Sequence, residues 1–134
     1  MSFQFICISC GHNHDSTQYR TLCILCQGLL KVSYSRPLTT DHQVLAGKQG
    51  IGKYLPTLPI KNPDNIVTLG EGNTPIIRLR SMENKIEINQ IYAKLEYMNP
   101  TGSFKDRGNS VQISVLKELG IKKFAEIGAG NTGH

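Results

Sequence analysis

Four cysteines near the start of the chain stand in two pairs of the form Cys-x-x-Cys, Cys7 and Cys10 in "CISC" and Cys23 and Cys26 in "CILC". Each such turn can direct two thiolates toward a common point. Two turns together complete the tetrahedral sulfur shell that Zn²⁺ prefers, with Zn–S bonds of about 2.3 Å. A filled shell leaves no position for a substrate, so this zinc would be structural, folding a module too small to build its own core.

Other interpretations of the cysteine pattern are weaker. Four unrelated buried cysteines would not be paired so regularly, and a redox Cys-x-x-Cys usually occurs once and opens a helix. His12 or His14 could replace one thiolate as a ligand. Because four sulfurs already fill the shell, we expect both histidines to be solvated loop residues.

A second reactive candidate is Lys105, in the stretch "NPTGSFKDRG". The string "SFKD" has the form of a capping box, which predicts a helix that begins at Ser103 and carries Lys105 in its first turn. The positive end of the helix dipole and partial burial against Phe104 would lower the pKa of the lysine and free its amine to bond with an aldehyde. The alternative is a solvated lysine paired with Glu96 or Asp106.

Three segments of different composition must position these residues. Residues 1–34, called the N-terminal module below, hold all four cysteines. Residues 35–66 are rich in Pro, Gly and polar residues, which predicts an extended connector with one helical turn near 43–46. Residues 67–134 are the most regularly patterned.

Within the third segment, apolar alternation predicts strands over 76–79 and 91–95. A helical pattern follows and ends at Gly120, a C-terminal cap residue. A short apolar-biased strand over 122–128 then leads into a Gly-rich loop. The order strand, helix, strand predicts a parallel β-α-β unit of an α/β fold.

Three strings in this order, "LGEGNTPIIRL", "YAKLEYMNPTGSFKDRG" and "GAGNTGH", resemble the N-terminal part of the threonine synthases, which are pyridoxal-phosphate enzymes of fold type II. The string "GIGKYLPTLP" is similar to the segment that precedes their catalytic domain. The N-terminal module resembles the zinc-ribbon-like extension of some members and of the related cysteate synthases. The resemblance implies a partial fold type II domain over 67–134, and conversion of O-phosphohomoserine to threonine and phosphate.

The same resemblance assigns roles to individual residues. Lys105 would bond to the cofactor aldehyde and move protons among the substrate carbons, while the cofactor ring acts as the electron sink. Asn131 would hydrogen-bond the phenolic oxygen of the cofactor. Gly130 and Thr132 would belong to the loop whose N–H groups receive the substrate carboxylate.

The loop "AEIGAGNTG" departs from the threonine synthase pattern, because Gly128 and Ala129 stand where a hydroxyl residue usually precedes the Gly-Asn pair. It is similar to the "AETGAGQHG" loop of the tryptophan synthase β subunit, whose Glu takes part in acid–base chemistry. Glu126 falls at the matching position and implies, as an alternative, β-replacement on a serine- or phosphoserine-type substrate. The other interpretation is that Glu126 ends a strand and faces water.

The second Gly-rich loop, which holds the cofactor phosphate in this family, does not follow Lys105 in these 134 residues. The chain therefore corresponds to the front third of an enzyme, and we expect it to be inactive alone. The complete enzyme would act on a small amino-acid substrate and is compatible with a homodimer. A third interpretation is a non-catalytic remnant in which the N-terminal module serves as an interaction element.

Charge and hydropathy exclude other classes of partner. Fifteen Lys and Arg against ten Asp and Glu give a net charge of +5, but the basic residues are scattered and predict no nucleic-acid partner. No apolar run approaches the ~20 residues needed to cross a membrane, and the first residues lack the features of a secretory signal. The expected compartment is the cytoplasm, where cysteines stay reduced or bind metal.

Overall fold

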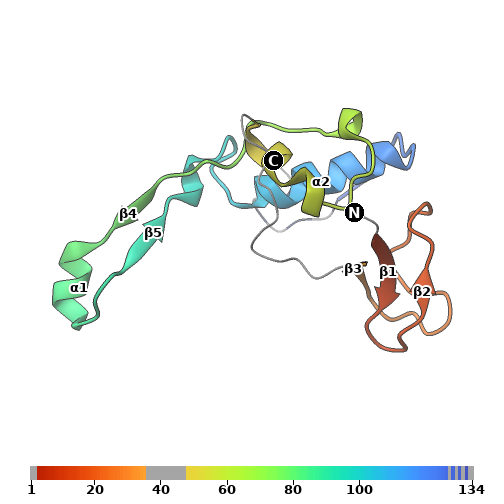
Figure 1. Ribbon diagram of the computed structural model, residues 1–134, viewed down its shortest axis with the longest axis horizontal. Coiled ribbons are helices and arrows are strands. Elements are labelled where there is room, and N and C mark those ends of the chain that lie inside the picture. The colour runs from red at the N-terminus through yellow and green to blue at the C-terminus, as the bar shows by residue number, and fades with distance from the viewer. Residues whose placement is uncertain (1–2, 36–47, 127, 129, 131, 133–134) are drawn as a thin grey trace.

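The computed structural model describes residues 3–35, 48–126, 128, 130 and 132. Figure 1 shows the N-terminal module on one side, helix α2 in the middle and an arm built from β4, α1 and β5 that extends away on the other side. In the described part of the chain, no helix combines the length and the apolar character needed to cross a membrane.

The N-terminal module contains a small antiparallel sheet. Strand β1 (Phe3–Cys7) lies between β2 (Asn13–His14) and β3 (Leu30–Tyr34). The buried hydrophobic residues of the module are Phe3, Cys7 and Cys23. Because so few apolar side chains are buried, the sheet needs a further constraint to be stable.

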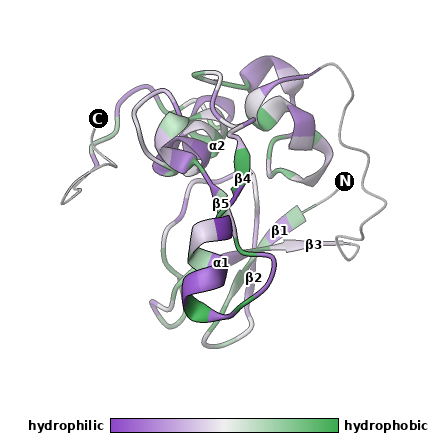
Figure 2. Cartoon of the chain, turned by 90° about the vertical axis from the view of Figure 1, so that its left-hand side faces the viewer, coloured by the Kyte–Doolittle hydropathy of each residue, from purple (hydrophilic) through white to green (hydrophobic). Residues whose placement is uncertain are grey.

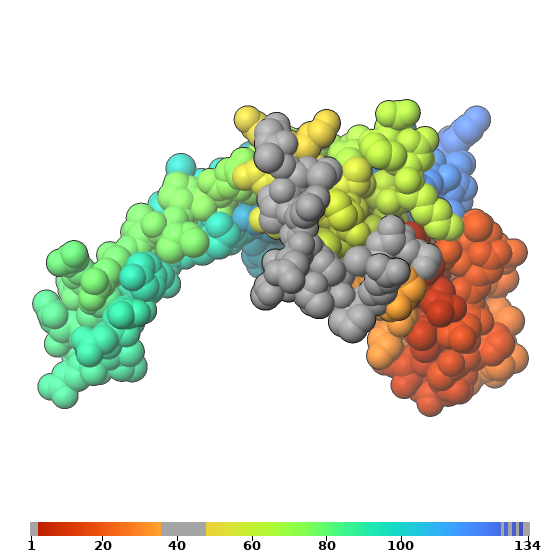
Figure 3. Space-filling model, viewed as in Figure 1, coloured from red at the N-terminus to blue at the C-terminus, as the bar shows by residue number. Residues whose placement is uncertain are grey.

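The arm begins and ends with two short strands, β4 (Ile76–Arg78) and β5 (Tyr92–Lys94), which pair antiparallel. The strands predicted over 76–79 and 91–95 are thereby confirmed. Helix α1 (Arg80–Ile86) connects them and was not expected from the sequence. The arm stands clear of the other parts in Figure 3, and Figure 2 shows hydrophobic and hydrophilic residues interleaved along it.

A buried carboxylate holds α1 against the strands of the arm. Glu83 accepts hydrogen bonds from Arg78 Nε at 2.8 Å and from the backbone N–H of Ile91, also at 2.8 Å. These bonds lower the pKa of Glu83, with Arg78 making the largest contribution. The arm is therefore joined by polar bonds, while many of its apolar side chains, such as Ile76 and Tyr92, are exposed.

Helix α2 (Lys105–Glu118) confirms the predicted helix and its end. Gly120 adopts the left-handed conformation with φ +72°. Its N–H donates to the carbonyl of Lys117, and the N–H of Ile121 donates to the carbonyl of Leu116, both at 3.0 Å. These two bonds form the Schellman motif, which satisfies the last carbonyls of the helix.

The described residues do not form the parallel β-α-β unit that the sequence predicted. Residues 121–126, which cover most of the expected strand, form no strand, and β4 pairs antiparallel with β5. The physical reason is that a strand needs a neighbour to receive its hydrogen bonds. No neighbouring strand lies beside 121–126 in the described part of the chain.

Residues 48–66 of the connector contain more regular structure than the sequence predicted. They include two 3₁₀ helices, Gly50–Thr57 and Pro63–Asn65, whereas the helical turn expected near 43–46 lies outside the described residues. The carboxylate of Glu118, at the end of α2, accepts from the backbone N–H of Asn62 at 2.8 Å. The hydroxyl of Ser114 accepts from the N–H of Val67 at 2.8 Å. The connector is thus tied along α2.

Candidate functional site

The turn that leads into α2 places Lys105 at the first residue of the helix. Gly102 closes the turn with φ +76°, and its N–H donates to the carbonyl of Asn99 at 2.8 Å. The hydroxyl of buried Ser103 accepts from the N–H of Lys105 at 3.2 Å. The predicted capping box does not form, and the helix begins at Lys105 instead of Ser103. The N–H of Asp106 donates to the backbone carbonyl of Ser103, and the Asp106 carboxylate is bonded to Thr101.

Asp106 is buried and its carboxylate faces back across the turn. One oxygen accepts from the backbone N–H of Thr101 at 2.9 Å, and the other accepts from the Thr101 hydroxyl. A negative charge in the first turn of a helix is also favoured by the helix dipole. Asp106 thus fixes the turn and the start of α2 to each other.

A cluster of four polar side chains lies beneath this turn and is called the Glu96 cluster: Thr74, Glu96, Asn99 and Arg107. Arg107 donates from Nε and Nη2 to the two carboxylate oxygens of Glu96, at 2.7 and 2.8 Å. The hydroxyl of Thr74 and the amide of Asn99 donate to the same carboxylate, at 2.7 and 3.0 Å. Arg107, and then Thr74 and Asn99, lower the pKa of Glu96 to about 2.

The loop before β4 closes over the Glu96 cluster through Gly72. The N–H of Gly72 donates to the side-chain carbonyl of Asn99 at 2.9 Å. Gly72 has φ +97°, and a Cβ atom there would lie 3.2 Å from Nη1 of Arg107. Both observations call for glycine at this position. The strings "LGEGNTP" and "EYMNPTGSFKDRG" are therefore brought together in space.

The buried carboxylate of Glu71 also orders the loop before β4. Glu71 accepts from the Thr68 hydroxyl and the Leu69 N–H, both at 2.8 Å, and from the N–H of Ile51 at 3.3 Å. Burial raises the pKa of Glu71, but these hydrogen bonds outweigh it and the pKa is lowered. Sequence reasoning did not single out Glu71, Thr74 or Arg107. Their position inside the motif strings was the available signal.

Lys105 itself is exposed, and its Nζ atom lies 5.1 Å from the centroid of the Phe104 ring. The burial expected against Phe104 is not found, because that ring is itself 58% exposed. The expected alternative partners are both engaged elsewhere, Glu96 with Arg107 and Asp106 with Thr101. Among the described residues, Lys105 takes part in no ion pair.

A cavity of about 430 Å³ lies along α2. Its walls come from the loop before β4, from α2 and from the segment after α2: Val67, Leu69, Asp106, Asn109, Ser110, Gln112, Ile113, Phe124, Glu126 and Thr132. Glu126 is exposed and lies in no strand. Lys105 is not among the lining residues, so Glu126 and Lys105 do not share this cavity.

The Gly-rich loop is described only in part. Asn131 lies outside the described residues. The carbonyl of Thr132 accepts from the side-chain amide of Asn109 at 3.2 Å, which ties this loop to α2. Gly130 is exposed, with open space where a Cβ atom would stand.

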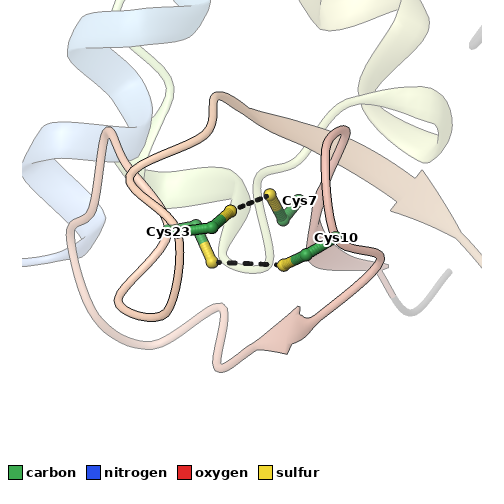
Figure 4. Close-up of side chains that lie close together, drawn as sticks. Cys7, Cys10 and Cys23 are labelled. Atoms are coloured by element: carbon green, nitrogen blue, oxygen red, sulfur yellow. Dashed lines mark hydrogen bonds between the residues drawn. The ribbon is translucent and has the colours of Figure 1, made fainter.

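The four cysteines converge, as their spacing predicted. All four Sγ atoms lie within 4.8 Å of one another. The pairs Cys7–Cys26 and Cys10–Cys23 are 3.5 and 3.6 Å apart. Figure 4 labels Cys7, Cys10 and Cys23, whose side chains point toward a common centre. Tetrahedral Zn–S bonds of about 2.3 Å correspond to S–S distances of about 3.8 Å. All four thiols are free of disulfides, so this donor set fits zinc.

Backbone N–H groups around the sulfurs favour thiolates. Ser9 donates to Cys7 Sγ and Leu25 donates to Cys23 Sγ, each at 3.4 Å. The backbone N–H of Cys10 is the largest of the causes that lower the pKa of Cys7 to about 6. The pKa of Cys26 moves the other way, to about 12: its bond from the Gly28 N–H lowers it, but the neighbouring thiols raise it. A bound cation would offset the repulsion between several neighbouring thiolates.

The two histidines of the N-terminal module pack against each other, with ring centroids 4.8 Å apart. The metal-ligand cluster found in the described residues contains only the cysteines. His14 is buried, which corrects the expectation of a solvated loop residue, and burial lowers its pKa.

Comparisons with known proteins agree on one family. Residues 67–134 match the family described as "Pyridoxal-phosphate dependent enzyme". The chain is 36% identical to the threonine synthase of Methanocaldococcus jannaschii over 130 residues, which cover 94% of the chain and 32% of that enzyme. It is 38% identical to the threonine synthase of Methanosarcina acetivorans over 128 residues, which cover 94% of the chain and 31% of that enzyme.

A third relative, the threonine synthase of Synechocystis, is 42% identical over 83 residues, covering 61% of the chain and 22% of the enzyme. No solved structure gives a significant match. The chain spans about a third of the length of the first two relatives. Since the matched residues make up half of the chain and include the whole Lys105 turn, the chain belongs to the family of pyridoxal-phosphate-dependent enzymes.

Proposed function

We propose that this chain is the first part of a fold type II enzyme of the threonine synthase type, which converts O-phosphohomoserine to threonine and phosphate. The observation that carries the proposal is the match to threonine synthases along 94% of the chain, through the turn that presents Lys105. The whole protein, which we expect to be a homodimer, would supply the loop that holds the cofactor phosphate.

The residues around Lys105 fit a lysine that bonds to the cofactor aldehyde. Its amine is exposed and forms no ion pair within the described residues, so no carboxylate has to be displaced before it reacts. When bound, the cofactor would draw electrons away from the substrate carbons. The Lys105 amine would move protons at those carbons. Asn131 would hydrogen-bond the cofactor's phenolic oxygen, and the N–H groups of Gly130 and Thr132 would hold the substrate carboxylate.

The Glu96 cluster supports this chemistry by fixing the geometry of the turn. Its bonds tie together the loop before β4, the residues after β5 and the first turn of α2. A reactive group must be held within a fraction of an ångström of its productive position, and the residues behind it supply that restraint. Glu96 and Arg107 are thus positioning residues for Lys105.

The assignment of Lys105 is tested with the whole protein and pyridoxal phosphate. Incubation should give an absorbance band near the visible edge, and borohydride reduction should attach the cofactor to the peptide that contains Lys105. Lys105→Ala should abolish both signals. Lys122→Ala, which removes an exposed lysine beyond α2, serves as the matched control. A band that survives in Lys105→Ala shows that another residue binds the cofactor.

A second candidate function, β-replacement on a serine- or phosphoserine-type substrate, rests on the similarity of the loop around Glu126 to that of the tryptophan synthase β subunit. Glu126 lines the cavity along α2 and Lys105 does not, so this function requires the whole protein to bring the two residues to one substrate. The carboxylate of Glu126 could then exchange a proton with that substrate. Product analysis with O-phosphohomoserine and O-phosphoserine separates the two reactions. Threonine from the first substrate supports threonine synthesis. A β-replacement product from the second, lost in Glu126→Gln, supports the alternative.

We also propose that Cys7, Cys10, Cys23 and Cys26 bind a structural zinc ion, because their sulfurs converge to the spacing of a tetrahedral shell. Protein purified without oxygen should contain one zinc per chain. Replacement by Co²⁺ should give the absorption bands of a tetrahedral thiolate site. Cys10→Ser should weaken the binding of both Zn²⁺ and Co²⁺. Protein that binds neither metal contradicts the proposed site.

A further inference from the structure

Helix α2 faces the N-terminal module across an apolar groove of about 290 Å³. The helix contributes Val111, Val115 and Leu119, which recur every four residues and so lie along one face. The module contributes Phe5 of β1 and Val32 of β3, which are paired across the sheet. Two parts of the chain that are distant in sequence therefore share one apolar surface.

One residue of the connector contacts both the N-terminal module and α2. The side chain of Lys61 donates to the Ser16 hydroxyl at 3.1 Å, and its Nζ lies 5.4 Å from the centroid of the Phe3 ring. The backbone N–H of Lys61 donates to the carboxylate of Glu118, at 2.9 Å to Oε2. Lys61 thus links the sheet of the module to the last turn of α2.

We propose that the N-terminal module is a metal-dependent brace for α2, the helix that begins at Lys105. The proposal rests on the zinc site proposed above. A module with so few buried apolar residues obtains its folding free energy from the metal, so metal loss loosens the sheet that carries Phe3, Phe5 and Val32. The contacts of Lys61 with Ser16 and Phe3 are then lost, and Phe5 and Val32 no longer form a fixed wall opposite α2. The last turn of α2 keeps its bonds to the connector.

The consequence reaches Lys105 along a continuous helix. Coupling between sites is carried by packed side chains and rigid elements, and α2 runs without a break from the module-facing stripe to the turn of the proposed cofactor lysine. Zinc would therefore reduce the opening of α2 and hold the Lys105 amine in a narrower range of positions.

The test compares the whole protein with Zn²⁺ added and with zinc removed by a chelator. Hydrogen exchange measured by mass spectrometry should slow in the α2 peptides by on the order of fivefold when zinc is bound. Reductive trapping of Lys105 by pyridoxal phosphate, measured in the same samples, should be faster with zinc. This second readout reports the Lys105 amine itself and would not change if the module were only an independent folded unit.

Lys61→Ala separates the brace from the metal site, because it removes the contacts with Phe3 and Ser16 but leaves the backbone N–H that bonds Glu118. The variant should still bind one zinc per chain and should lose most of the zinc effect on α2. Lys31→Ala, which removes an exposed lysine of β3, should keep the full effect.

The outcomes are distinct. Zinc that binds to the four thiolates without slowing exchange in α2 overturns the brace and leaves the metal site intact. Lys61→Ala with an undiminished zinc effect also overturns it. Protein that binds no metal overturns the zinc site and, with it, the brace. The assignment of Lys105 to the cofactor is judged separately by Lys105→Ala in zinc-loaded protein.

Discussion

Arg107, two residues after Lys105, donates hydrogen bonds to both carboxylate oxygens of Glu96, with N–O distances of 2.7 and 2.8 Å. Such two-pronged contacts fix geometry as well as contributing energy. The pair joins the first turn of α2 to the 3₁₀ helix Glu96–Met98. The turn that carries the proposed cofactor lysine, Lys105, is therefore fixed by an ion pair between the first turn of α2 and the residues before it.

Glu96→Gln tests this relationship. Glutamine keeps the shape of the side chain but removes the charge and places an amide N–H₂ near Arg107. We expect a loss of about 1–2 kcal/mol in the free energy of unfolding, measured by urea denaturation. Glu87→Gln, at the exposed end of α1, is the matched control and should change stability by less than about 0.5 kcal/mol. Equal effects of the two substitutions would show that the ion pair contributes little.

The same pair predicts how stability depends on pH. The pKa of Glu96 is lowered to about 2 in the folded protein from an ordinary value of 4.5. Its contribution is therefore complete above about pH 4.5 and is lost as the pH falls toward 2. Urea midpoints should fall more steeply over this range in the wild type than in Glu96→Gln. Parallel curves would mean that another carboxylate, such as Glu71 or Glu83, dominates acid unfolding.

Asp106→Ala should loosen the start of α2. The substitution leaves the N–H and the hydroxyl of Thr101 without their acceptor, at a cost of about 1–3 kcal/mol. Thr101→Val removes only the hydroxyl donor and should cost less. Circular dichroism during thermal unfolding measures both. A larger effect of Thr101→Val would show that the hydroxyl, and not the backbone bond, holds the turn.

Gly28→Ala should weaken metal binding. A Cβ atom at Gly28 would lie 2.5 Å from the Ser9 hydroxyl and 3.0 Å from Cys7 Sγ, so the two Cys-x-x-Cys turns would have to separate. We expect at least tenfold weaker zinc affinity in competition with a chelator. Adding Ser9→Gly removes the closest of these contacts and should restore part of the affinity. Unchanged affinity in Gly28→Ala would show that the turns can separate at no cost.

Local signals predicted the elements of this chain well. The strands within 76–79 and 91–95 and the helix that ends at Gly120 follow from periodicity and a glycine cap, which depend on near neighbours in the sequence. The parallel crossover was wrong because strand formation over 121–126 depends on a partner strand that no local pattern can supply. Helix α1 was missed because "RSMENKI" has little apolar periodicity, and Glu83 holds it through side-chain bonds instead.

The candidate site was predictable to the same extent. The convergence of four sulfurs follows from the spacing of the two pairs alone. The sequence also placed Lys105 in the first turn of a helix, although the cap predicted at Ser103 does not form. The partners of Glu96 could not be predicted, because Thr74 and Arg107 stand 22 and 11 residues away from it. Only the folded chain shows that these polar residues meet beneath one turn.

The turn before α2 is held by hydrogen bonds and charge, with Phe104 and Tyr97 largely in solvent. Opening it would expose little new apolar surface. Such an opening has a small change in heat capacity and a weak dependence on denaturant concentration. The turn would therefore be open for the same fraction of the time in dilute urea as in water. Salt and acid, which act on its charges, would govern how often the proposed cofactor lysine is out of place.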